Sequence, residues 1–499
     1  MRTSFLFVAL FIFCKPLYAQ SSLIAKGTIR DKKTGEPLIG VIVFTGDGKN
    51  ATTTDENGNY SLLLPSDTSS VTFSYLGYKK VTQKYSHSTP ERLDISLQAD
   101  EVVLETVEVV TDRYAASERI KSAQLGLENV SVKEAKLIPA LFGEVDIIKV
   151  LQLKPGIKSG GEGMAGFFVR GGGVDQNLIT IQEAPVYNPN HLFGFFSLFN
   201  SDAVKDVDVY KAGFPARYSG RLSSVLDFHM REGSKEKWGV NGGIGLISSR
   251  LAIETPIKKD KSSLLIAGRR TYVDIFTDFI NRQNADNPNY TLIPSYYFHD
   301  LNLKFNTKVG EKDNFSLTAY YGTDAFRFNR TSAKSRFDWT NAIASAQWQH
   351  RYSNRLSSNH TLYFSSYNYL IDNSFNNASL NLGSGIYDIG TKNEWNYTPS
   401  ENHTFKAGFD LVRHNFNINN FNFTNGTPQI TSGQQRSGIQ AGVYLSDDYD
   451  ISPSIKINAG ARISSFFVPD GVNFGLEPRL NSRFNITPNT AFKLSYTRM

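Results

Sequence analysis

The chain has 499 residues, too many for one ordinary domain, and its 13% aromatic content and 39 glycines suit short strands and turns. Its 53 basic and 47 acidic residues are scattered and leave a net charge of +6, which argues against a nucleic-acid-binding face. Beyond the first residues no apolar run approaches the ~20 residues that a membrane-spanning helix needs, so a helical membrane protein is excluded.

Residues 1–19 have the layout of a secretory signal peptide. Arg2 gives the positive start, an apolar stretch follows, and Ala19 precedes the expected cleavage before Gln20. A buried N-terminal strand or helix is the alternative interpretation. The single cysteine, Cys14, lies in this leader, so the exported chain would have no thiol. A thiolate nucleophile, a cysteine-ligated metal and a disulfide framework are thereby excluded.

Residues 20–99 predict a small all-β domain. Five or more short strands separated by glycine-containing turns favour a sandwich. Asp47, Asp55 and Glu56 could be metal ligands, but acidic residues in such turns more often form Asx turns. The alternating runs are residues 25–30, 39–45, 60–64, 71–75 and 93–97.

Residues 100–119 predict a linker with a β-prone centre at residues 104–111. This run is either a last sandwich strand or inert linker, or an unpaired extended segment. Only the unpaired form could add as a strand to the sheet of a partner.

Residues 120–236 predict an α+β domain of short strands broken by glycine and proline. Residues 142–153 have helical spacing of apolar residues. Gly161, Gly163 and Gly166 match the GxGxxG pattern, but a helical stretch precedes them and a β run follows, which is the wrong context for a dinucleotide site. We interpret them as a mobile loop. The β runs are residues 167–170, 178–181 and 207–211.

Residues 237–499 predict long amphipathic strands. Residues 405–411, 455–464 and 492–497 alternate between apolar and polar side chains, as a wall between lipid and a wet lumen requires. Short connections alternate with long polar or aromatic ones, which favours an outer-membrane barrel over a soluble sandwich. We count about 13 strands of ~10 residues. The short connections are near residues 258–261, 310–313, 353–358, 399–402, 452–454 and 488–489, and the long ones near 278–295, 326–337, 372–384, 415–435 and 468–473.

Four consecutive pieces of the chain resemble the plug of TonB-dependent outer-membrane receptors. They are VRGGG (169–173), DQNLITIQEAPVYN (175–188), HLFGFFS (191–197) and YKAGFPARYSGRLSSV (210–225). The pieces GTIRDKKTGEPLIGV, TDENGNYS and SYLGYKK resemble the carboxypeptidase regulatory-like domain often appended to such receptors. The resemblance implies a plug inside a 22-stranded barrel. Because about 13 strands are found before Met499, we expect a chain that is incomplete at its C-terminus.

The resemblance also implies the fold class and the sites. We expect a mainly β protein with an N-terminal β-sandwich, an α+β plug and a partial antiparallel transmembrane β-barrel. A TonB box would lie just before the plug, at Glu105, Thr106, Val107, Glu108, Val109 and Val110. The plug motif would comprise Arg170, Gly171, Gly172, Gly173, Asp175, Asn177, Arg217 and Arg221. Its three arginines are either buried against the wall and paired with barrel carboxylates, or solvated turn residues.

The implied function is active import of a scarce solute, such as a siderophore, vitamin, oligosaccharide or peptide. The implied partners are TonB with its inner-membrane complex and outer-membrane lipid, with no cofactor and with the N-terminal domain in the periplasm. The alternatives are a structural, adhesin-like or signalling barrel, and a surface hydrolase. The hydrolase is disfavoured because the chain contains neither HExxH nor GxSxG. Aromatic residues of the long connections suit either ligand stacking or an interfacial girdle.

Overall fold

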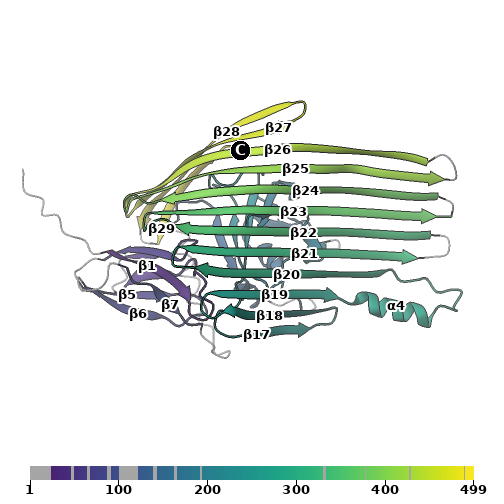
Figure 1. The fold of residues 1–499 in the computed structure, drawn as a ribbon, viewed down its shortest axis with the longest axis horizontal. Coiled ribbons are helices and arrows are strands. Elements are labelled where there is room, and N and C mark those ends of the chain that lie inside the picture. Colours follow the sequence, from purple (N-terminus) through teal and green to yellow (C-terminus); the bar gives the residue numbers. More distant parts are fainter. Residues whose placement is uncertain are drawn as a thin grey trace, which may run out of the picture. The chain divides into compact units, whose positions relative to one another are not determined.

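The computed structural model describes residues 24–46, 50–64, 68–86, 92–99, 122–138, 143–161, 166–191, 194–329, 333–376, 378–425, 429–487 and 489–499. These residues form two compact units (Figure 1). The first comprises the described residues up to 99 except 33–35, and the second comprises the others. The expected leader, its cleavage site between Ala19 and Gln20, and the linker at 100–119 lie outside the described residues.

The first unit is a β-sandwich, as the sequence predicts. One sheet has the order β4-β1-β7 and the other β3-β2-β5-β6. Ile29, Val43, Phe73 and Leu97 fill the space between them and are fully buried. Asp55 accepts hydrogen bonds from the backbone N–H groups of residues 57 and 59, which confirms its role in an Asx turn. The strands are β1 (Ile24–Asp31), β2 (Ile42–Thr45), β3 (Ala51–Thr53), β4 (Asn59–Leu63), β5 (Thr68–Ser74), β6 (Val81–Ser86) and β7 (Ile95–Leu97).

The N-terminal part of the second unit, residues 122–236, is an α+β plug. Its central sheet has the order β12-β11-β16-β15-β8, in which only β11 and β16 are parallel. Two small hairpins, β9–β10 and β13–β14, complete it. The elements are β8 (Leu127–Ser131), α2 (Val132–Ala135), α3 (Ile147–Leu151), β9 (Ile157–Ser159), β10 (Phe167–Val169), η1 (Val174–Gln176), β11 (Asn177–Ile181), β12 (Ala184–Pro185), β13 (Asn190–His191), β14 (Phe196–Ser197), β15 (Val204–Tyr210) and β16 (Ser224–Met230).

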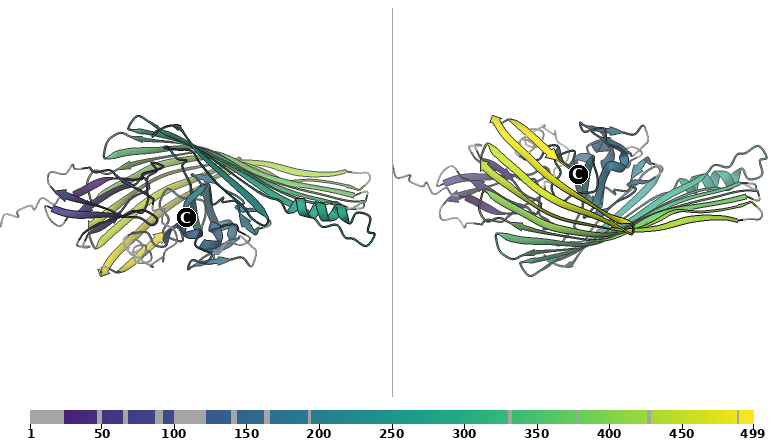
Figure 2. Two further views of the ribbon diagram at one scale, coloured as in Figure 1. Left: turned by 90° about the horizontal axis from the view of Figure 1, so that it is seen from below. Right: turned by 90° about the horizontal axis from the view of Figure 1, so that it is seen from above.

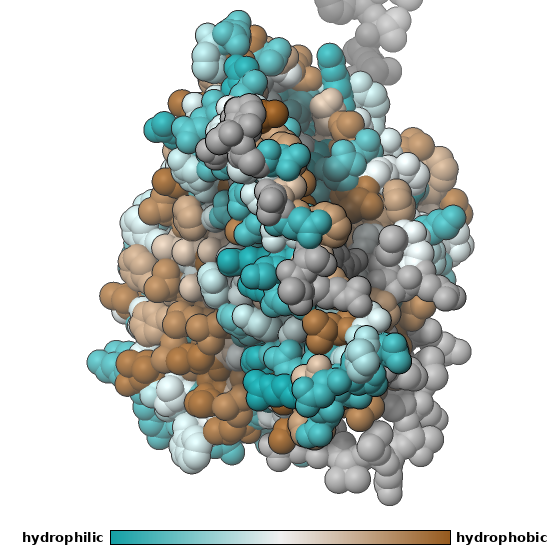
Figure 3. Space-filling view, turned by 90° about the vertical axis from the view of Figure 1, so that its right-hand side faces the viewer, coloured by the Kyte–Doolittle hydropathy of each residue, from teal (hydrophilic) through white to brown (hydrophobic). Residues whose placement is uncertain are grey.

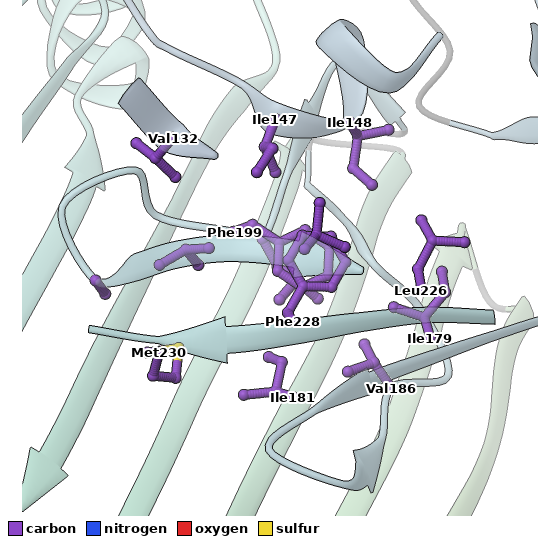
Figure 4. Close-up of a cluster of buried hydrophobic side chains, with 14 of the residues drawn as sticks. Val132, Ile147, Ile148, Ile179, Ile181, Val186, Phe199, Leu226, Phe228 and Met230 are labelled. Atoms are coloured by element: carbon purple, nitrogen blue, oxygen red, sulfur yellow. The ribbon is translucent and has the colours of Figure 1, made fainter. Parts of the chain in front are cut away.

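The plug has an apolar core in which α3 packs on the sheet (Figure 4), and this core continues into buried wall residues such as Leu265 and Ile343. The rings of Phe199 and Phe228 stack with centroids 3.4 Å apart, and Ile148 of α3 is buried with them. Asp146 caps α3 by accepting hydrogen bonds from the backbone N–H groups of residues 148 and 149. The helix is shorter than the expected 142–153. Of the three glycines expected to form a mobile loop, Gly161 and Gly166 lie between β9 and β10, and Gly163 lies outside the described residues. A strand, and not a helix, therefore precedes that loop.

Within the described residues, thirteen strands form one antiparallel sheet, here called the wall, in sequence order from β17 to β29. Its two end strands do not pair with each other, so the sheet is open. Figure 2 shows that it is curved and that the plug lies on its concave side. The strands are β17 (Gly239–Ile244), β18 (Ser248–Lys258), β19 (Ser262–Thr271), β20 (Ser295–Val309), β21 (Asp313–Asn329), β22 (Ala333–Arg351), β23 (Leu356–Phe375), β24 (Ala378–Tyr397), β25 (His403–Asn425), β26 (Gln429–Ser452), β27 (Ile455–Val468), β28 (Gly471–Thr487) and β29 (Thr490–Thr497).

The wall has an apolar convex face and a polar face toward the plug. On β20, Asn302 and Lys304 are buried on the plug side, whereas Leu301 points outward and is half exposed. On β27, Arg462 is buried while its neighbour Ile463 is exposed. Figure 3 shows hydrophobic residues gathered along its left flank, toward which the convex face of the sheet is turned. The predicted period-two pattern of a barrel wall is therefore confirmed.

The long connections expected at residues 326–337, 372–384, 415–435 and 468–473 are wrong. β21 to β26 have 17 to 24 residues, and their hairpin ladders continue through most of these segments. The period-two alternation continues in these segments, but their apolar side chains face the plug side of the wall. In the sequence such segments therefore look like polar and aromatic loops. The long connection before β20 was expected, but its helix α4 (Val273–Gln283) was not. None of the helices described here is long and apolar enough to cross a bilayer.

Candidate functional site: the interface between plug and wall

The hairpin turn between β11 and β12 presses its backbone against the wall. Its two residues, Gln182 and Glu183, have φ angles of 48° and 73°, a region that residues other than glycine rarely adopt. The Gln182 carbonyl accepts a hydrogen bond from Ser345 Oγ at 2.8 Å, and its side-chain oxygen accepts one from Lys304 Nζ at 2.5 Å. Contacts with β20 and β22 therefore hold this strained turn in place.

Glu183 is the centre of a buried ion cluster. Its carboxylate pairs with Arg217 of the plug, and Lys392 Nζ of β24 lies 3.2 Å from the carboxylate and 2.9 Å from the Glu183 carbonyl oxygen. Arg217 is also 4.0 Å from Glu394 of β24, to which Tyr444 of β26 donates a hydrogen bond at 2.6 Å. Two cations and two carboxylates thus share one water-poor space, where each needs its partners.

A second cluster forms around His191, in β13 of the plug. Its Nδ1 lies 2.6 Å from Asp324 of β21, and its Nε2 lies 3.5 Å from Asp300 of β20. The imidazole also stacks on Phe298 with centroids 4.1 Å apart. Burial lowers the pKa of His191, but the two carboxylates outweigh this effect and raise the pKa above its usual range. The imidazole therefore joins plug and wall through both of its ring nitrogens.

Arg269 of β19 extends this cluster to the first plug helices. Its guanidinium donates to Asp300 at 2.7 and 2.9 Å and to the backbone oxygen of Ser197 at 2.9 Å, and lies 3.5 Å from Glu144. Asp146, the cap of α3, accepts hydrogen bonds from both the N–H and the hydroxyl of Ser197. The loop that precedes α3 is thereby linked to the wall through buried charges.

Tyr187 and Asn188 make a third set of contacts. Tyr187 donates a hydrogen bond to Asp388 of β24, which His414 of β25 also contacts at 2.8 Å. The Asn188 carbonyl accepts from Asn341 at 3.0 Å, and its side-chain nitrogen lies 3.4 Å from the Tyr367 hydroxyl. The plug loop at 186–191 is therefore bonded to several neighbouring wall strands.

The plug also contacts the C-terminal strands of the wall. The guanidinium of Arg479 on β28 pairs with Glu477 at 2.6 Å and donates to the backbone oxygen of Pro215. Ser219 donates to the same Glu477 side chain at 3.1 Å and lies 3.3 Å from the hydroxyl of Ser464. Wall strands at both ends of the sheet are therefore bonded to one plug.

The glycine part of the predicted plug motif serves the plug's own fold. Gly171 has φ +87°, and a Cβ on Gly172 would lie 2.3 Å from the Ser223 hydroxyl oxygen. Asn177 is buried, donates to the carbonyls of residues 167, 173 and 174, and accepts from Ser224 at 2.6 Å. Asp175 is exposed in the short helix η1. These residues lock the 169–177 loop and do not line the interface.

The three predicted arginines have different surroundings. Arg217 lies in the buried Glu183 cluster. Arg221 is partly exposed and donates to the neighbouring Gly220 carbonyl at 2.7 Å. Arg170 is exposed with φ +50°, which fits the alternative of a solvated turn residue.

Sequence reasoning missed Glu144, Glu183, His191 and Tyr187 as interface residues. Each pairs with a wall residue more than 100 positions away, so no local spacing reveals the partner. The only signal is that a charged or aromatic residue interrupts a largely apolar stretch. The predicted TonB contact, residues 105–110, lies outside the described part of the chain. Within the described part, no group of three or more His, Cys, Asp or Glu side chains could hold a metal ion.

Two family models match the chain. Residues 25–111 match a CarboxypepD_reg-like domain and residues 125–224 the TonB-dependent receptor plug domain. A TonB-dependent receptor P3 from Formosa agariphila is 29% identical over 140 residues, which cover 26% of this chain and 14% of that protein.

Solved structures share the fold at low identity. A mutant of the ferric enterobactin receptor PfeA from Pseudomonas aeruginosa has a TM-score of 0.57 at 13% identity, with 77% of this chain and 62% of that chain covered. The outer-membrane transporter YddB from Escherichia coli has a TM-score of 0.56 at 10% identity, with 74% and 60% covered. The chain thus spans less than two thirds of the length of these relatives.

A plug bonded to the polar face of an antiparallel sheet with an apolar outer face defines the class of plugged membrane β-barrels. Within that class, residues 125–224 match the plug domain of TonB-dependent receptors, and residues 25–111 match a carboxypeptidase regulatory-like domain ahead of it. The family is one of receptors and transporters and not one of enzymes.

Proposed function

We propose that the protein imports a scarce solute across the outer membrane and that the plug gates the passage. The observation that carries this proposal is the buried ionic interface, in which Glu183 and His191 of the plug are paired with Lys392 and Asp324 of the wall. Breaking such buried pairs costs several kcal/mol each, roughly 3–5. A plug held in this way needs an external source of work to open.

That work would come from TonB and its inner-membrane complex. Residues 105–110, ETVEVV, are β-prone and precede the plug directly, which suits pairing as an added strand with TonB. In this scheme residues 1–19 are a cleaved leader and residues 20–99 form a periplasmic domain. Residues 120–236 are the gate, and residues 237–499 belong to the membrane wall.

The test uses cells that produce the protein, with and without TonB. Uptake is measured for a panel of a ferric siderophore, cobalamin, and neutral and acidic oligosaccharides. We expect at least one member to enter only when TonB is present. The double substitution Val107→Pro/Val109→Pro should abolish that uptake, because proline removes the N–H donors that strand addition needs, while surface binding in the cold stays unchanged.

Two matched controls accompany it. Val107→Ile/Val109→Ile keeps β-branched residues and should preserve uptake, and Ala115→Pro/Ala116→Pro places the same prolines outside the segment. Uptake that is unchanged in the Val107/Val109 proline variant, or that is equal without TonB, would contradict the import mechanism and favour an adhesin-like or signalling barrel.

A further inference from the structure

A cavity of about 250 Å³ lies among the outer parts of β23, β24 and β25. It is lined by Tyr367, Tyr369, Ser384, Gly385, Ile386, Asn417 and Ile418. Its volume is near the lower end of small-molecule sites, which suits one ring of a larger ligand.

The cavity opens on the plug side of the wall. Tyr367 contacts Asn188 of the plug, and Tyr369, two residues further along the same strand, shares its face. Two ladder irregularities meet at this place, one between Gly383 and Gly385 and one between Ile418 and Phe421. Bulges change the direction of side chains and are enriched beside binding sites. The two irregularities therefore give the wall a local shape at the cavity that a regular ladder would not have.

Around the cavity the wall inverts its amphipathic pattern. Phe326 packs edge-on against Phe337 with centroids 5.5 Å apart on the plug side, and Trp339 packs there against the buried Phe298 cluster. On the outward side of the same strands, Asp338 forms ion pairs with Arg327 and Arg336. Apolar side chains therefore line the inner surface at a height where the outer surface is polar and unsuited to lipid.

Two carboxylates near the cavity, Asp324 and Asp388, are already paired. Asp324 accepts hydrogen bonds from Tyr296 and contacts His191, and Asp388 is bonded to Tyr187 and His414. The exposed Arg436 of β26 lies beyond them, with its guanidinium 3.4 Å from the side-chain oxygen of Gln434. None of the seven described residues that line the cavity is charged, so they offer no ion pair to a charged ligand.

We propose that this cavity binds a ring of an uncharged oligosaccharide; this rests on the proposed import function and names its substrate class. The two tyrosine rings, with centroids 6.4 Å apart and planes at 41°, offer apolar faces to the C–H side of a sugar ring. Ser384, which pairs with Tyr369 in the ladder and so shares its face, offers a neutral hydroxyl to the hydroxyls of the sugar. Because Tyr367 touches Asn188, a bound sugar would contact a residue that is bonded to the plug.

The test measures binding to outer-membrane vesicles that carry the protein. The probes are neutral oligosaccharides of several linkages, their sulfated or uronic acid counterparts, and a ferric catecholate siderophore. We expect saturable binding of at least one neutral oligosaccharide. Tyr369→Ala should weaken it about tenfold, and Tyr369→Phe, which keeps the ring, should restore it. The matched control Tyr387→Ala changes the same residue type on the outward face of β24 and should bind as the unsubstituted protein does.

Two results would overturn the inference. The first is that no neutral oligosaccharide binds, whether or not a charged probe does. The second is that the Tyr369→Ala and Tyr387→Ala variants bind the neutral oligosaccharide with equal affinity. The proposed import function is judged separately by TonB-dependent uptake. Coupled uptake of a charged solute would refute the substrate class and leave import standing. Tyr369-dependent sugar binding without TonB-dependent uptake would refute import and leave the sugar site standing.

Discussion

Nδ1 of His191, on the plug, lies 2.6 Å from the carboxylate of Asp324 on β21, and each side chain is only 1% exposed. Removing the carboxylate leaves the buried imidazole without its nearest polar partner. We expect Asp324→Ala to lower the opening free energy of the plug loop at 186–191 by about 3 kcal/mol. Hydrogen exchange of those amides measures it.

Asp338→Ala is the control for that experiment. Asp338 pairs with two cations, Arg327 and Arg336, but on the outward, partly solvated face of β22. Its loss should cost about 1 kcal/mol or less. Equal effects of the two substitutions on the 186–191 amides would show that the His191 pair does not hold the loop.

Arg217 and Arg221 provide a second contrast within one motif. Arg217→Met leaves Glu183 buried with one cation fewer, so we expect the unfolding free energy of the plug to fall by about 3 kcal/mol. Arg221→Met removes a partly exposed side chain and should change it by about 0.5 kcal/mol or less. Denaturant titration of the detergent-solubilised protein compares them, and similar midpoints for both variants would contradict the buried-cluster interpretation.

Gly172 tests the packing of the plug loop. A methyl group there would collide with Ser223, whose hydroxyl donates to the Val169 carbonyl at 2.8 Å. Gly172→Ala should therefore destabilise the plug by about 1–3 kcal/mol. Gly471→Ala, at a position with nothing within 4 Å of the added carbon, is the control and should be nearly neutral. Thermal unfolding of both variants decides, and an unchanged midpoint for Gly172→Ala would show that the loop can adjust.

His229 predicts how plug stability depends on pH. Burial lowers its pKa, but Asp208, 3.2 Å away, together with Asp227 and Asp206, outweighs this effect and raises the pKa to about 10. A raised pKa in the folded state stabilises that state fully below the unfolded value of ~6.5. The contribution declines above that value and is lost as the pH passes about 10.

Relative to the unsubstituted protein, His229→Gln should therefore lose most stability at pH 6 and least above pH 10. Unfolding midpoints across this range give the difference between the two proteins. A difference that does not change with pH would mean that His229 contributes no charge.

Residue spacing predicted the parts of the fold that depend on local pattern. The turn at Asp55 and the alternation at residues 455–464 both follow from neighbours along the chain. The outer strand segments were missed because they keep the period-two alternation but place the apolar side chains on the plug side. A rule that expects apolar residues on the outward face therefore assigns them to loops. α4 was missed because it lies inside a connection that was correctly expected to be long.

The candidate site was much less predictable than the fold. Glu183 and Lys392 are 209 residues apart, and the pair exists only because the plug docks on a sheet formed later in the chain. Arg217 could be predicted because arginine commonly pairs with carboxylates in such interfaces. Its nearest carboxylate belongs to the plug itself, which composition alone could not indicate.

The position of β8 at the edge of the plug sheet sets an order of mechanical failure. β8 is the first described strand of the plug, and its ladder with β15 begins at the pair Leu127 and Tyr210. A pull on the chain ahead of residue 124 loads the bonds of the Gln124 and Gly126 carbonyls to Lys493 and Lys211 first. It then loads the Leu127 pair and its neighbours one at a time, as in peeling. The parallel pair β11 and β16 lies inside the sheet and has no free end in line with the pull. Tension would therefore strip the N-terminal edge of the plug before it reaches the turn at Glu183.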